Sequence, residues 1–126
     1  MNTTNIRHWQ SKHNDWLRAL NFYKGEIKIL NDRLTEISGK YTSKEIATQV
    51  EHFQNQFVLH RDNEEKLEHS IRHNLEQIAR DAEAKTGFVS NNLLEQLQQN
   101  QQEFLSEEQH VNQLRHEFNA FCSSWM

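Results

Sequence analysis

Apolar residues recur every three or four positions along almost the whole chain. The first stripe of this kind runs through Ile6, Trp9, His13, Trp16, Leu20, Tyr23, Ile27, Leu30, Leu34 and Ile37. Two further stripes with the same spacing occupy residues 43–85 and 90–123. Steps that alternate between three and four residues average close to 3.5, which is the period of α-helices that pack around one another in a supercoil.

The pattern therefore predicts an all-α protein. We expect an up-down-up antiparallel bundle of three long helices, at about residues 5–38, 43–85 and 90–123, with coiled-coil-like packing in one domain, 1–126. Thr42 and Glu45 have the spacing of a capping box that begins the second helix. Gly39 and Gly87 are placed to end the first and second helices. A cap-like segment at Asp62 leaves open a break in the second helix, although the stripe keeps its phase across it.

Composition supports long helices with a narrow buried seam. Proline is absent, only three glycines occur, and 35% of the residues are hydrophobic. Glycine and proline are the main residues of turns, so a chain this poor in both has few connections between its elements. The low apolar content fits a thin core between helices better than a thick two-layer core.

Charge and cysteine content indicate which kinds of partner and which cellular compartment the protein has. The formal net charge is −4 with acids and bases interspersed, and nothing resembles the basic stripe of a nucleic-acid-binding protein. The apolar runs are far too short to cross a membrane, and Met1–Asn5 has no features of a secretory signal. Cys122 is the single cysteine and fits a reducing compartment. We expect a cytoplasmic protein with no nucleic-acid or membrane partner.

Two hairpins also predict which residues lie opposite one another. Folding the chain about residue 40 places His13 near Glu68, and folding it about Gly87 places Glu64 opposite His110. The same fold places Asn74 opposite Asn100. Two asparagines that face each other in an apolar seam fix the register of the helices, because a buried amide is tolerated only when its partner is in place.

The expected positions of the two hairpins also predict that one end of the bundle is not covered by the first helix. The first helix begins near residue 5, so we expect it to be too short to cover the far end of the second helix. The apolar residues expected to remain exposed there are Ile78, Ala82, Leu93, Leu94 and Leu97. An exposed apolar stripe of this kind usually marks an interface. This end predicts a homodimer, or docking of another helical protein.

Eight histidines raise the alternative of a metal site. Glu107 and His110 have the Glu-x-x-His spacing of di-metal carboxylate bundles, and the expected register brings Glu64 and His13 to the same level. Such a site would hold Fe, Mn or Zn. Two other interpretations stay open: a polar layer of His13, Glu64, Glu107 and Asn100 that fixes register, or a pH-sensitive layer around His13 and His110.

Signals of catalysis are weak. The sequence has no glycine-rich phosphate loop and no nucleophile elbow, and Cys122 stands near the end of the third helix. Asp15-Trp16-Leu17 on the first helix is similar to a short segment of spectrin-type repeats; the likeness covers this stretch and the general three-helix architecture, and it assigns no family. We expect a non-enzymatic structural bundle that self-associates or binds a helical partner. The alternative is a metal-binding bundle of the di-metal carboxylate and histidine type.

Overall fold

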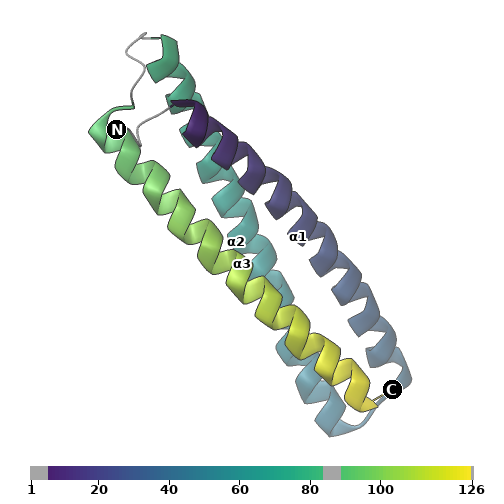
Figure 1. The fold of residues 1–126 in the computed structure, drawn as a ribbon. Coiled ribbons are helices and arrows are strands. Elements are labelled where there is room, and N and C mark those ends of the chain that lie inside the picture. Colours follow the sequence, from purple (N-terminus) through teal and green to yellow (C-terminus); the bar gives the residue numbers. More distant parts are fainter. Residues whose placement is uncertain (1–5, 84–88, 126) are drawn as a thin grey trace.

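The computed structural model describes residues 6–83 and 89–125, and these form an all-α bundle. Its helices are α1 (Ile6–Lys40), α2 (Lys44–Glu83) and α3 (Asn91–Trp125). They run up, down and up alongside one another, so α1 and α3 are parallel and α2 is antiparallel to both (Figure 1). The predicted fold class is confirmed. Helix α2 continues through Asp62 without interruption, so the alternative break there is excluded.

The helix ends differ in detail from the predicted caps. Ser43, rather than Thr42, is the N-cap of α2, because its Oγ accepts a hydrogen bond from the backbone N–H of Ile46 at 3.2 Å. Ser90 does the same for Leu93 at the start of α3, also at 3.2 Å. Gly39 lies inside the last turn of α1, which runs on to Lys40. The predicted end of α2 at Gly87 lies outside the described residues.

The core is one seam that divides into two apolar clusters. Cluster 1 lies toward the N-terminus of α1 and contains Trp9, Trp16, Leu20, Tyr23, Leu67, Ile71, Ile78, Val89, Leu93, Leu97, Phe104 and Val111. Cluster 2 lies toward the other end and contains Ile27, Leu30, Leu34, Ile37, Ile46, Val50, Phe53, Phe57, Leu114, Phe118, Phe121 and Cys122. Phe53 contacts the rings of both Phe118 and Phe121, with centroids 5.3 and 5.2 Å away. The seam positions are buried from Trp9 to Ile37 in α1, from Ile46 to Ile78 in α2 and from Leu93 to Phe121 in α3.

The register of α3 against α2 differs from the predicted one by about one helical turn. Ser70, rather than Asn74, hydrogen-bonds Asn100, at 3.0 Å. The backbone N–H of Ser90 donates to the Asp81 carboxylate at 2.9 Å, so the start of α3 lies beside Asp81 of α2. Asn74 is still buried and lines the same small surface hollow as Asn100.

Helix α1 is also displaced relative to the prediction. Lys24, rather than His13, contacts Glu68, with Nζ 3.1 Å from its carboxylate. The connection to α2 comprises residues 41–43 alone, so the α1–α2 hairpin turns later in the sequence than residue 40. Each residue of α1 therefore lies opposite a residue of α2 that comes later in the sequence than predicted.

This displacement removes the predicted uncovered end. Ile78, Leu93 and Leu97 are buried within the single chain, and Leu94 is half-buried against them. Trp9, at the start of α1, belongs to the same cluster and covers this level. Of the five residues predicted to form an interface, Ala82 alone is exposed. The prediction of an exposed leucine stripe was wrong because α1 reaches further along α2 than the assumed hairpin allowed.

Candidate functional site

Polar side chains are buried at two levels of the seam. In the described ranges the buried polar residues are His13, His60, Glu64, Asn74, Asn100 and Glu107. His13 and Asn100, with Ser70, form what we call the His13 layer. His60, Glu64 and Glu107 form the Glu64 layer. Asn100 and Glu107 are seven residues apart on α3, so the layers are separated by about 10 Å along the helix.

The His13 layer is a chain of hydrogen bonds across all three helices. The Nδ1–H of His13 donates to the carbonyl of Trp9 at 2.9 Å, which leaves Nε2 as an acceptor. The side-chain amide of Asn100 lies 3.3 Å from this Nε2 and donates to it. The Oδ1 of Asn100 in turn accepts from the hydroxyl of Ser70 at 3.0 Å. This arrangement uses a neutral imidazole.

Burial favours that neutral form. His13 is fully buried, and desolvation lowers its pKa to about 4, against a smaller opposing effect of the bond to Trp9. Aromatic rings surround it, with Trp16 at a centroid distance of 4.5 Å and Trp9 at 6.2 Å. Trp16 stacks on Phe104 of α3. The imidazole of His13 is thus an uncharged structural part of the core.

In the Glu64 layer, His60 and Glu107 have the geometry of an ion pair, whereas the carboxyl group of Glu64 stands apart from both. The Nδ1 of His60 lies 2.9 and 3.2 Å from the two carboxylate oxygens of Glu107, and both side chains are almost fully buried. Glu64 is 0% exposed. Among the residues that the structure describes, neither of its carboxyl oxygens has a hydrogen-bond partner.

An isolated buried carboxyl group is stable in its protonated form. Burial is the largest cause that raises the pKa of Glu64 to about 9, and Glu107 contributes to the same shift as a hydrogen-bond acceptor, which favours the protonated acid, and through its negative charge. Lys24 opposes this shift and Glu26 adds to it, but both effects are smaller. At neutral pH the layer therefore holds one neutral carboxylic acid, from Glu64, next to the His60–Glu107 pair.

The Glu64 layer also divides the core. On α2, Phe57 belongs to cluster 2 and Leu67 to cluster 1, and His60 and Glu64 lie between them. On α3, Glu107 occupies the seam between Phe104 and Val111. The layer therefore separates the two clusters on α2, whereas on α3 both Phe104 and Val111 belong to cluster 1 and cluster 2 begins at Leu114.

Partly buried polar contacts surround the Glu64 layer at the helix boundaries. Arg115 of α3 holds Glu26 of α1 through Nε at 2.7 Å and through a second nitrogen. The hydroxyl of Tyr23 donates to Glu108 at 2.6 Å. Burial, followed by this bond to Glu108, raises the pKa of Tyr23 to about 12. These contacts join α1 to α3 beside the Glu64 layer.

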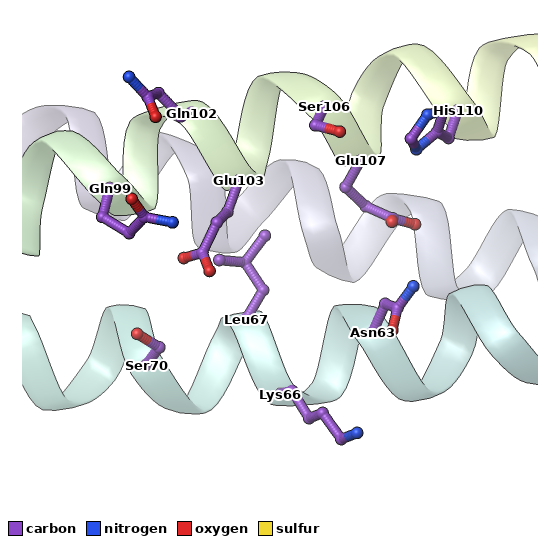
Figure 2. A pocket seen from close by; sticks show the side chains of 10 residues that line it. All are labelled: Asn63, Lys66, Leu67, Ser70, Gln99, Gln102, Glu103, Ser106, Glu107 and His110. Atoms are coloured by element: carbon purple, nitrogen blue, oxygen red, sulfur yellow. The ribbon is translucent and has the colours of Figure 1, made fainter.

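The groove between α2 and α3 gives solvent access to this level. One hollow of about 520 Å³ is lined by Asn63, Lys66, Leu67, Ser70, Gln99, Gln102, Glu103, Ser106, Glu107 and His110. Figure 2 shows Glu107 extending from α3 toward α2 near Asn63, whereas Lys66 and Gln102 point away from the hollow. His60 lines the adjoining hollow, and Asn63 and His110 line both. Glu64 lines neither of these two hollows.

The structure does not bring the four predicted metal ligands together. His13 belongs to one layer, whereas Glu64 and Glu107 belong to the other. His110 lies at the exposed rim, with its ring 6.1 Å from that of His60. Within 6–83 and 89–125, no group of three or more histidine, cysteine, aspartate or glutamate side chains is arranged to hold a metal ion.

Two site residues were not predicted. His60 was not named as the partner of Glu107, although its seam position and its spacing of four from Glu64 were available as signals. Ser70 stands beside the seam, where a small hydroxyl residue carries no periodic signal. Its role depends on the register of α3, which the sequence pattern did not determine.

Comparison with known proteins assigns no family. No protein-family model, curated protein or solved structure matches the chain. None of the helices in the described part of the chain has a stretch both long and apolar enough to span a membrane.

Proposed function

We propose that this chain is a non-enzymatic helical bundle that works by association, with a second copy of itself as the partner. The observation that carries the proposal is the exposure of Phe22 and Ile29, which are 64% and 62% exposed on one side of α1. Residues seven apart lie on the same side of a helix. Two large apolar side chains at that spacing form a contact surface for another helix.

The buried polar groups support the same reading. His13 and Asn100 are engaged in hydrogen bonds inside the bundle, as are His60 and Glu107. These hydrogen bonds hold the three helices together. Cys122 is buried, and a single buried thiol fits a reducing compartment, so we place the protein in the cytoplasm.

Sedimentation equilibrium over a wide concentration range tests this function. We expect a mass that rises from that of one chain to that of two as protein concentration increases, because association follows mass action. A mass that stays at one chain up to about 200 µM would contradict the proposal, since an association weaker than that falls below the usual range of specific interfaces.

A further inference from the structure

The outward side of α1 carries a second stripe with the spacing of a coiled-coil seam. Its members follow one another in steps of four, three, four and three residues, and they are Arg18, Phe22, Gly25, Ile29 and Asp32. All five are exposed. We call them the outer stripe. A stripe with this period is the surface that a helix offers to another helix.

The outer stripe faces away from the other two helices. Lys24 contacts Glu68 of α2, and Glu26 contacts Arg115 of α3. Gly25 stands between these two residues in the sequence, on the opposite side of α1 from the buried seam. Figure 1 shows α1 as an outer helix of the bundle along its whole length. Packing within the chain therefore leaves most of the surface of Phe22 and Ile29 uncovered.

Gly25 is the least expected member of this stripe. Glycine inside a helix costs about 1 kcal/mol relative to alanine. A Cβ added at Gly25 would meet nothing within 4 Å, so packing within the chain does not require a glycine there. Glycine does allow a second backbone to approach closely. Its position midway between Phe22 and Ile29 places that close approach at the centre of the stripe.

The charges of the stripe are complementary to its own reversed copy. Arg18 and Asp32 lie seven residues before and seven residues after Gly25, and they carry opposite charges. When two copies are antiparallel about Gly25, each arginine meets an aspartate and each phenylalanine lies next to an isoleucine. A two-fold interface requires this self-complementarity. A parallel arrangement would instead place arginine against arginine.

We propose that a second copy of this chain packs on the outer stripe, with the two α1 helices antiparallel and Gly25 at the two-fold axis. This inference rests on the proposed self-association and names its surface. Asp15 and Glu36 continue the stripe beyond its ends and carry the same charge, which confines the favourable contact to residues 18–32. Arg18 also contacts Asp15 of its own helix, and its side chain remains 73% exposed for a partner.

Charge reversal tests the antiparallel register. We expect Arg18→Asp and Asp32→Arg each to weaken the dimer of the full chain by roughly tenfold, because each replaces two attractions by two repulsions. Mixing the two variants should restore association as a heterodimer, since opposite charges meet again at both ends. Sedimentation of the separate and mixed variants, with one copy mass-tagged, measures both effects. All these positions are exposed, so the fold survives the changes.

Gly25→Leu provides a second, independent readout. The open space at this position accepts the side chain, so the thermal midpoint of the dilute, monomeric chain should rise, whereas dimerisation should weaken by tenfold or more. Val58→Glu changes a similarly exposed apolar residue on α2 and is the matched control, with no expected effect on association.

The outcomes separate the two proposals. A wild-type chain that remains monomeric contradicts both the proposed function and the outer-stripe dimer. A dimer whose stability is unchanged by Arg18→Asp and Gly25→Leu leaves the proposed function standing and overturns this surface. Failure of the mixed charge variants to form a heterodimer, when each alone has lost the dimer, overturns the antiparallel register.

Discussion

The His13 layer and the Glu64 layer lie in the same seam of the same three helices, yet they treat buried polarity in different ways. In the His13 layer a neutral imidazole, an amide and a hydroxyl satisfy one another. In the Glu64 layer one pair is satisfied and the Glu64 carboxyl group has no hydrogen-bond partner among the described residues. A satisfied buried network holds helices in one register, whereas an unsatisfied buried group lowers stability. The two layers therefore predict opposite responses to the same kind of mutation.

The largest effect is expected from breaking the His13 layer. Asn100→Leu should lower the free energy of unfolding by about 2–4 kcal/mol, because it leaves the Nε2 of fully buried His13 and the hydroxyl of half-buried Ser70 without their partner. Urea unfolding measures the change. Gln99→Leu, at the exposed neighbouring position, is the matched control and should change stability little. A loss no larger for Asn100→Leu than for Gln99→Leu would show that the layer contributes no specific stability.

The same polar-to-apolar change should have the opposite sign in the Glu64 layer. Glu64→Met keeps a similar length and removes the isolated carboxyl group, so we expect stability to rise by about 1–3 kcal/mol. Glu65→Met, on the exposed side of α2, controls for helix propensity. Destabilisation by Glu64→Met at neutral pH would mean that the carboxyl group makes a favourable contact in the core.

Between about pH 4 and pH 9, the pH dependence of stability is expected to follow mainly from the shifted pKa values of Glu64 and His13. The folded-state pKa of Glu64, about 9, lies above its ordinary 4.5, so its contribution to stability is complete below pH 4.5 and is lost as the pH rises to 9. The folded-state pKa of His13, about 4, lies below its ordinary 6.5, so its contribution is complete above pH 6.5 and is lost as the pH falls to 4. The two trends oppose each other between pH 4.5 and 6.5.

We therefore expect the free energy of unfolding to fall as the pH rises from 6.5 to 9, by at most about 1.4 kcal/mol per pH unit because one proton is released. The thermal midpoint should fall with it. Thermal unfolding followed by circular dichroism across this range measures it. Glu64→Gln removes the titrating group and should flatten the alkaline side. An equally steep fall in Glu64→Gln would assign the effect to another residue.

The smallest effect is expected at the partly exposed boundary of the Glu64 layer. Replacing Glu26 or Arg115 by glutamine should cost about 0.5–1 kcal/mol, and the double variant should cost little more than either single one. The comparison pair is Asp15 and Arg18, which is more exposed and should contribute less. Equal coupling energies for the two pairs would show that the Glu64 layer does not strengthen the contact between α1 and α3.

The sequence predicted the helices well because each seam residue carries its own periodic signal. Ile71 and Leu97, for example, are recognised from their spacing alone. The register was not predictable to better than a turn, because it depends on the connections. Ser43 is the N-cap of α2 where Thr42 was expected, and the backbone N–H of Ser90 donates a hydrogen bond to Asp81. These local contacts shift whole helices, and the shift separates His13 from Glu64.

The same reasoning explains the wrong interface and the surface that was not predicted. The displacement of α1 along α2 was enough to bury Leu93 and Leu97, which the predicted register left exposed. Phe22 and Ile29 stand outside the seam, so a prediction of one apolar stripe per helix does not include them. Their spacing of seven, with Gly25 between them, was present in the sequence as a second and shorter stripe.

Direct titration of Glu64 tests the contrast between the two layers most sharply. In a protein labelled with ¹³C at the glutamate carboxyl carbon, loss of a signal in Glu64→Gln assigns the resonance of Glu64. We expect this resonance to keep the chemical shift of a protonated acid through neutral pH and to titrate with a midpoint near 9 in the folded chain. A midpoint near the ordinary value of 4.5 would show that Glu64 is ionised at neutral pH, and would contradict the description of the layer as unsatisfied and neutral.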